Sequence, residues 1–185
     1  MKLLQFVETF NLVVAFVITA LYSYQAVYLV LGLLRRHWRD RREPVRLRRY
    51  AALISARNEE GVIGELIASL KRQNYPAELL DVYVVADNCN DDTAGVAQAA
   101  GAKVYRRFDH SRVGKGYALD HLLKKLTEDG LESRYEGYFI FDADNIVDTN
   151  FVSEMNRTFD RGEFVALTGY RNSKNFGQNW ITAGY

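Results

Sequence analysis

The longest apolar stretch of the chain lies near its amino terminus. It runs from Leu12 to Leu34 as LVVAFVITALYSYQAVYLVLGLL, within the segment Thr9 to Leu34 that lacks Asp, Glu, Lys, Arg and His. About 20 apolar residues are enough to cross a bilayer as a helix. A long buried or amphipathic helix is the alternative, but these apolar residues show no narrow stripe. We therefore predict that residues 1–34 form a transmembrane anchor.

A strongly basic segment follows the apolar stretch. Residues 35–49, RRHWRDRREPVRLRR, contain eight arginines. Positive charge beside a membrane span marks the cytoplasmic side, where anionic lipid is a more suitable partner than nucleic acid. A cleaved signal peptide carries its charge before the apolar stretch and has a small-residue cleavage site, unlike this sequence. We predict a linker at the inner face of the cell membrane, with the remainder of the protein in the cytoplasm.

Beyond the linker, short apolar runs alternate with amphipathic stretches. The runs predict strands, and the stretches predict helices with one apolar face. The expected strands are YAALISA (50–56), LLDVYVVADN (79–88), AKVYRRF (102–108), GYFIFDAD (137–144) and EFVALTGY (163–170). The expected helices cover residues 59–73, 91–101, 117–130 and 149–162. This alternation indicates an α/β domain over residues 50–185, with an open, mainly parallel sheet and flanking helices.

Composition supports a packed core and limits the classes of function. Hydrophobic residues make up 48% of the 185 residues, which argues against disorder. In the helix over residues 117–130, the expected core positions are Leu119, Leu122, Leu123 and Leu126. The formal charge of +1 gives no argument for a nucleic-acid partner. Cys89 is the single cysteine, so an intramolecular disulfide is excluded, and three scattered histidines do not suggest a zinc cluster.

Charged residues follow the ends of the expected strands. Glu59 comes just after the first strand, Asp87 ends the second, and Lys115 opens the helix after the third. Asp142 and Asp144 end the fourth strand. Each has an ordinary alternative, since Asp87 could form a turn and Lys115 could be a solvated helix residue. Ligands of open α/β sheets bind outside the carboxyl ends of the strands, so the joint placement predicts one polar crevice.

Asp142 and Asp144 raise a specific chemical question. Residues two apart on a strand project from the same face, and neighbouring carboxylates repel unless a cation lies between them or one holds a proton. The pair therefore indicates a metal, a shared proton or an exposed loop. Mg²⁺ or Mn²⁺ takes oxygen ligands and commonly bridges carboxylates to a diphosphate, which then becomes a good leaving group. With Lys115 on the phosphates, and with Asp87 and Glu59 accepting from a base and a ribose, these parts would form a nucleotide-sugar site.

Other nucleotide and metal motifs do not fit the sequence. In DNCNDD, Cys89 and Asp92 stand where a calcium loop needs a ligand and a glycine. VGKG lacks the earlier glycine of a phosphate-binding P-loop and the Ser or Thr after its lysine. No G-x-G-x-x-G follows the first strand, and no G-x-S-x-G elbow occurs.

Four short motifs, in their order and spacing, resemble those of family-2 glycosyltransferases with a GT-A fold. They are SARNEE (55–60), the strand-ending Asp87, GKGYAL (114–119) and FDAD (141–144), and the resemblance covers residues 50–170. It implies a GT-A-like, Rossmann-like sheet and the transfer of a sugar from a nucleotide sugar, with UDP as the expected nucleotide. It also implies a saccharide or lipid acceptor and a membrane anchor of the kind found in polysaccharide and glycolipid synthases.

The resemblance also implies roles for the matching residues. The implied donor-binding residues are Ala56, Arg57, Glu59, Asp87, Lys115 and Asp142. The implied ligands of Mg²⁺ or Mn²⁺ are Asp144 and Asp142. Within this set, Asp87 would accept the uracil N3–H, and Lys115 would contact the diphosphate or the ribose.

The chain departs from the family pattern in one respect. Family members carry a catalytic base, usually in an E-D or T-E-D motif on a later helix, and the acids after Asp144 have no such setting. We therefore expect the base of an inverting enzyme beyond Tyr185, and a donor-binding part within these residues. Two alternatives stay open. One is a haloacid-dehalogenase-type phosphatase with Asp142 as nucleophile, because FIFDADNI approaches its D-x-D-x-[TV] motif, and the other is a non-catalytic nucleotide-binding or scaffold subunit at the membrane.

Overall fold

The computed structural model describes residues 2–38, 45–162 and 165–170, which fall into two units, Met1–Pro44 and Val45–Tyr185. In the first unit, α1 (Lys2–Tyr22) and α2 (Tyr24–Trp38) are separated at Ser23. The Ser23 hydroxyl donates to the carbonyl of Ala20 at 2.7 Å, a local bond that competes with regular helix.

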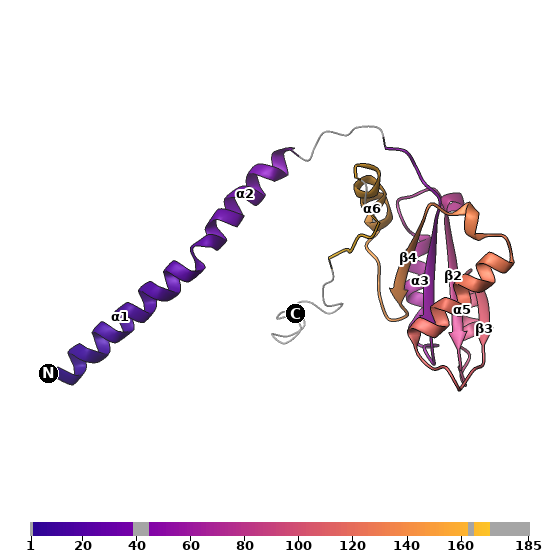
Figure 1. Ribbon diagram of the computed structural model, residues 1–185, viewed down its shortest axis with the longest axis horizontal. Helices are drawn as coiled ribbons and strands as arrows, with labels where there is room; N and C mark the ends of the chain where they lie inside the picture. The colour runs from indigo at the N-terminus through magenta and orange to yellow at the C-terminus, as the bar shows by residue number, and fades with distance from the viewer. Residues whose placement is uncertain (1, 39–44, 163–164, 171–185) are drawn as a thin grey trace. The chain divides into compact units, whose positions relative to one another are not determined.

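The first unit contains one stretch that is long and apolar enough to cross a membrane. It spans Leu4–Leu34, 31 residues whose side chains are exposed within the unit. Figure 1 shows its helices, α1 and α2. The stretch begins eight residues before the apolar run at Leu12 and lies within the anchor predicted over residues 1–34. Length and composition agree with a membrane span.

The second unit is built on a four-stranded sheet in its described residues. The strands are β1 (Tyr50–Ala56), β2 (Leu80–Asp87), β3 (Lys103–Arg107) and β4 (Gly137–Asp142). Their spatial order is β3-β2-β1-β4, and every pairing is parallel. All four carboxyl ends therefore lie along the same edge of the sheet (Figure 1). The predicted open, parallel α/β architecture is confirmed.

Helices cover both faces of this sheet. The helices are α3 (Ile63–Lys71), α4 (Thr93–Ala99), α5 (Lys115–Glu128) and α6 (Phe151–Asp160), with 3-10 turns η1 (Ala77–Leu79) and η2 (Glu132–Arg134). α5 lies across one face, and α3 lies on the other (Figure 1). Because strands covered on both faces need apolar side chains at successive positions, β1 and β2 are near-continuous apolar runs.

The alternation of side chains along β1 divides the core into two clusters. Ile54 packs toward α3, α4 and α6, whereas Leu53 packs toward α5. On α5 the buried row is Ala118, Leu122 and Leu126. Leu123, predicted to face the core, is 40% exposed. The prediction was wrong because α5 buries a narrow row at every fourth position, which leaves Leu123 to one side.

The predicted fifth strand is wrong for the residues described. Residues 165–170 form no strand, and the predicted positions 163 and 164 lie outside the described residues. Val165 is 102% exposed and Tyr170 is 89% exposed. A strand is stabilised by pairing with a neighbour, and none of the described strands pairs with this segment. β-propensity alone is not sufficient to form a strand here.

The last arginines of the basic segment belong to the second unit and form ion pairs within it. Arg48 pairs with Glu136 at 3.0 Å and with Asp160 at 2.9 Å. Arg49 pairs with Asp81, the second residue of β2, at 2.8 Å. These ion pairs fix the point at which the chain enters β1, at the amino edge of the sheet.

Candidate functional site

The carboxyl edge of the sheet brings together residues that are far apart in the sequence. Asp142 is the last residue of β4, and Lys115 is the first residue of α5. The Lys115 ammonium forms an ion pair with the Asp142 carboxylate across 27 sequence positions. The side chains are 45% and 40% exposed, respectively, so a ligand from solvent can reach both groups.

The start of α5 is suited to an anion. Gly114 precedes the helix with a φ of +137°, a conformation that glycine adopts without strain. The first N–H groups of a helix have no partner within the helix and carry partial positive charge, so this end attracts phosphate groups. Lys115 adds a full positive charge at the same place. Helix and side chain together favour a diphosphate.

The spacing of Asp142 and Asp144 had predicted that they share one face of a strand. The structure differs. β4 ends at Asp142, and the N–H of Asn145 donates to the carbonyl of Asp142 at 3.1 Å, which closes a turn. Ala143 is buried and Asp144 is exposed. The regular alternation stops where the turn begins, so a turn, and not the strand, sets the direction of Asp144.

These two carboxylates are the candidate metal ligands. The described residues contain no group of three or more His, Cys, Asp or Glu side chains able to hold a metal ion. Mg²⁺ and Mn²⁺ do not require such a cage, because they commonly use one or two carboxylates and complete their coordination with phosphate oxygens and water. A pair of exposed or half-exposed aspartates beside a lysine therefore fits a metal–diphosphate ligand.

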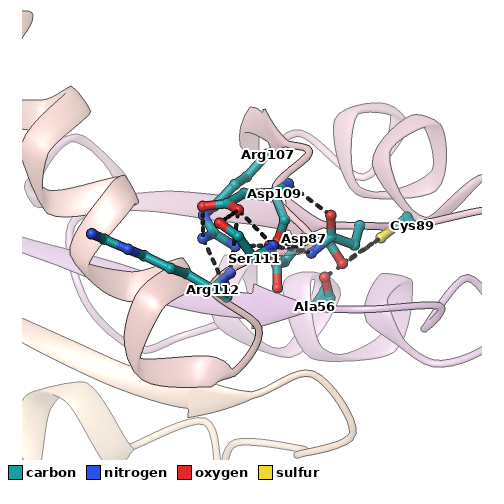
Figure 2. A network of polar contacts seen from close by, with 8 residues as sticks. Ala56, Asp87, Cys89, Arg107, Asp109, Ser111 and Arg112 are labelled. Atoms are coloured by element: carbon teal, nitrogen blue, oxygen red, sulfur yellow. Dashed lines mark hydrogen bonds and ion pairs between the residues drawn. The ribbon is translucent and has the colours of Figure 1, made fainter.

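Asp87 is more buried than expected for a residue that lines a polar crevice. It is 3% exposed, and its neighbour across the sheet is Arg107, which ends β3 and is 6% exposed. Asp87 Oδ1 accepts from an Arg107 guanidinium nitrogen at 2.6 Å (Figure 2). It also accepts from Asn88 Nδ2 at 3.2 Å. Both bonds use Oδ1, and Asp87 Oδ2 accepts no hydrogen bond from the described residues.

Arg107 also holds the loop that follows β3. Its second terminal nitrogen donates to Asp109 Oδ2 at 2.8 Å and to the carbonyl of Arg112 at 2.7 Å (Figure 2). Asn88 fastens the same loop, because its side-chain oxygen accepts from the Asp109 N–H at 2.8 Å. The hydroxyl and N–H of Ser111 bond to Asp109 and keep the pKa of Asp109 below its usual value.

The predicted nucleoside-binding residues of the β1–α3 loop have different exposures. Ala56 is buried, and its carbonyl accepts a weak bond from the Cys89 thiol at 3.5 Å. Arg57 is exposed and Glu59 is half-buried. The Glu59 N–H donates to Thr93 Oγ1 at 2.8 Å, which ties this loop to the start of α4. These bonds join the β1–α3 loop to the segment between β2 and α4, which directly follows Asp87.

Arg107 was missed as a candidate functional residue. The sequence did carry a signal, because an arginine at the end of one strand and an aspartate at the end of the preceding strand suit each other if those strands are neighbours. The register pairs Asp87 directly with Arg107. Strand order was therefore the information needed to find this pair.

Comparison with known proteins identifies the family. The model of glycosyl transferase family 2 matches residues 51–184, well over half of the chain. The chain belongs to glycosyl transferase family 2. One family-2 relative, beta-monoglucosyldiacylglycerol synthase from Synechocystis sp., is 29% identical over 137 residues, which cover 71% of this chain and 27% of that protein. Another, 4,4'-diaponeurosporenoate glycosyltransferase from Staphylococcus aureus, is 42% identical over 69 residues, which cover 37% of this chain and 17% of that protein.

The family-2 chain also shares its fold with solved structures. The mannosyltransferase PcManGT from Pyrobaculum calidifontis, in complex with GDP-Man and Mn²⁺, has a TM-score of 0.51 at 20% identity, over 79% of this chain and 43% of that one. S. aureus TarS 1–349 in complex with UDP has a TM-score of 0.50 at 20% identity, over 61% of this chain and 32% of that one. These similarities establish the GT-A fold and nothing further. The chain spans about a quarter or less of the two named relatives.

Proposed function

We propose that this family-2 protein is a membrane-anchored glycosyltransferase that transfers a sugar from a UDP-sugar to a saccharide or lipid acceptor, using Mg²⁺ or Mn²⁺. The observation that carries the proposal is the contact between Lys115 and Asp142, with Asp144 two residues further on, at the carboxyl edge of a family-2 sheet. This edge is where α/β sheets bind their ligands. Two proteins of the same fold were solved with UDP and with GDP-Man and Mn²⁺, so a nucleotide donor and a divalent metal are the ligands that we propose to test.

Each residue of the site has a distinct task in this proposal. Lys115 exchanges its carboxylate partner for the diphosphate, and the amino end of α5 adds backbone donors. Asp144 and Asp142 would hold Mg²⁺ or Mn²⁺, which when bound neutralises the charge that develops on the diphosphate as its bond to the sugar breaks. Asp87 would accept from the base, while Ala56, Arg57 and Glu59 border the nucleoside.

The acceptor side is proposed from the relatives and the apolar stretch. One relative is named for monoglucosyldiacylglycerol, a glycolipid. A helix that lies in the bilayer would keep the donor site near lipid acceptors, so a lipid hydroxyl is the acceptor that we test first. The hydroxyl oxygen attacks the anomeric carbon, UDP leaves, and the hydroxyl proton passes to a base that the residues assigned here do not supply.

The proposal is tested with the full-length protein in detergent. We expect UDP to bind in the presence of Mn²⁺ and to be released by a chelator, as followed by titration calorimetry. Membranes that contain the protein should then transfer label from a radiolabelled UDP-sugar into the lipid fraction. Metal-independent UDP binding, or no binding of UDP, would contradict the proposal.

Two further outcomes identify the alternatives. Metal-dependent UDP binding without transfer to lipid or saccharide acceptors would point to a nucleotide-binding scaffold. Release of inorganic phosphate from an aryl phosphate, lost in Asp142→Asn, would point to a phosphatase. Family-2 membership argues against the phosphatase.

A further inference from the structure

The buried guanidinium of Arg107 is held by three partners on two different segments. It bonds to Asp87 at 2.6 Å, to Asp109 at 2.8 Å and to the carbonyl of Arg112 at 2.7 Å. The first partner ends β2, and the other two lie in the loop between β3 and α5. Figure 2 shows the Arg107 side chain between these segments. A guanidinium whose two terminal nitrogens both donate to fixed acceptors has no freedom to turn away from Asp87.

Stability alone is a poor explanation for this pair. Both side chains are almost completely buried, with 6% of Arg107 and 4% of Asp87 exposed. Two charges removed from water lose their hydration, and apolar residues of similar size often replace such a pair without loss of stability. A buried pair at the end of strands, beside the ligand edge, is better explained by the position that it gives to a functional group.

That functional group is the second oxygen of Asp87. Oδ1 is occupied by Arg107 and Asn88, so the orientation of the carboxylate is set before any ligand arrives. Oδ2 accepts no hydrogen bond from the described residues and is left as the acceptor for a ligand N–H. An acceptor that is fixed in advance discriminates strongly, because a ligand that lacks the donor leaves it unpaired.

We infer that Arg107 is a positioning residue for nucleobase recognition: it aims Asp87 at a base that presents a ring N–H, such as the uracil of a nucleoside diphosphate. Through Asp109 and Arg112 it also ties this base-reading group to the loop that leads to Gly114 and Lys115. The inference rests on the proposed function, in which Asp87 reads the base. Arg107 touches Asp87 and not the ligand.

The test measures selectivity for the N–H, separately from affinity for the phosphates. The probes are UDP, its N3-methyl derivative, which lacks the N3–H, and inorganic pyrophosphate, each titrated into the complete chain with Mn²⁺. We expect the protein to bind UDP at least about tenfold more tightly than N3-methyl-UDP. In Arg107→Met the ratio of the two affinities, UDP over N3-methyl-UDP, should fall to about one. The affinity for pyrophosphate should stay within about twofold of the wild-type value.

Two other variants separate positioning from a general structural effect. Arg106→Met removes an exposed arginine from the same strand and should leave the ratio unchanged. Asp109→Asn loosens the guanidinium but keeps its bond to Asp87, so it should reduce the ratio by a smaller factor. Asp109→Asn also tests the positioning role if Arg107→Met does not fold. Arg107→Lys keeps a charge beside Asp87 and should restore part of the selectivity.

Each outcome has a definite meaning. Equal binding of UDP and N3-methyl-UDP by the wild-type protein would contradict recognition of the base by Asp87, which is part of the proposed function. A wild-type ratio that persists in folded Arg107→Met, or in Asp109→Asn when Arg107→Met does not fold, would overturn the inference alone. An equal loss of affinity for UDP, N3-methyl-UDP and pyrophosphate in Arg107→Met would assign Arg107 a structural role. That result would also overturn the inference.

Discussion

The charged residues at the carboxyl edge differ most in how far solvent reaches them. Lys115 and Asp142 are 45% and 40% exposed, whereas Asp87 and Arg107 are almost fully buried. An exposed ion pair contributes about 0–1 kcal/mol, so a diphosphate can replace one partner at little cost. A buried pair keeps its geometry. The exposed pair is therefore suited to exchange and the buried pair to orientation.

Asp144 allows a direct test of the metal assignment. We expect Asp144→Asn to weaken Mn²⁺-dependent UDP binding about tenfold or more, or about 1.4 kcal/mol, because it removes a charged ligand. Asp142→Asn should have a smaller effect, since Asp142 is shared with Lys115. Asp120→Asn, which alters an exposed carboxylate on α5, is the matched control. Calorimetry with and without Mn²⁺ measures all three, and unchanged metal dependence in Asp144→Asn would contradict the assignment.

Lys115 should act on the phosphates and not on the base. Lys115→Met is expected to weaken the binding of UDP and of pyrophosphate by the same factor, about tenfold. The reason is that the lost charge would contact the phosphates, which both ligands share. Its effect on the free energy of unfolding should stay below about 1 kcal/mol, since the ion pair is exposed. Lys124→Met changes a lysine on the same helix that pairs with Asp120, and serves as the control. A loss confined to UDP would place Lys115 on the ribose or base instead.

At the scale of elements, the two edges of the sheet have different tasks. At the amino edge, Asp81 accepts from Arg49 at 2.8 Å, from Lys103 at 2.9 Å and from the Tyr135 hydroxyl at 2.9 Å. One carboxylate thus joins the starts of β1, β2 and β3 to the segment before β4. Because this edge is held together by protein groups, the carboxyl edge can carry exposed charges that are available to a ligand.

The pKa of Asp81 predicts how this edge responds to acid. Burial alone would raise the pKa, but hydrogen bonds from Arg49, Lys103 and Tyr135 outweigh it and lower the pKa from 3.8 to about 2. The folded-state pKa lies below the ordinary value, so the stabilisation is present above about pH 3.8 and is lost as the pH falls toward 2. Between pH 4 and pH 2, the urea midpoint should therefore fall further in the wild type than in Asp81→Asn. Asp120→Asn should follow the wild type, and parallel curves for all three proteins would contradict the assignment.

At the scale of the whole molecule, apolar surface distinguishes the two units. In the first unit large hydrophobic side chains are exposed, among them Leu12 at 71% and Phe16 at 72%. The second unit has two clusters of buried apolar residues, one on either side of the sheet. Contiguous exposed apolar surface indicates a membrane or a protein partner. The length of Leu4–Leu34 and the arginines that follow it favour the membrane.

The orientation of the anchor can be measured with a reporter. We expect a reporter fused after Tyr185 to be cytoplasmic, because the basic segment stays on that side of the membrane and nucleotide sugars are available there. Alkaline extraction should leave the fusion in the membrane fraction. Replacement of five arginines by glutamine should weaken the preference for the cytoplasmic orientation. The five are Arg35, Arg36, Arg39, Arg41 and Arg42. A reporter that is active outside the cytoplasm would overturn both the orientation and the choice of donor.

The sequence by itself determined what depends on neighbouring positions. An uncharged apolar run indicated the possible span, and the alternation of apolar runs with amphipathic stretches predicted the parallel α/β sheet. It also placed Lys115 and Asp142 at ends of elements that meet at the same edge. These features follow from periodicity and charge along the chain, because parallel strands joined by helices put all their carboxyl ends on one side.

The tertiary structure decided what depends on distant neighbours. The order β3-β2-β1-β4 sets Arg107 opposite Asp87, and no local pattern contains that order. Leu123 is exposed because of what α5 packs against, and residues 165–170 form no strand because no described strand pairs with them. The turn after Asp142 redirects Asp144, although the spacing of the two is that of a strand. Burial, pairing and turn geometry arise from contacts between segments, and these contacts exist only after the chain has folded.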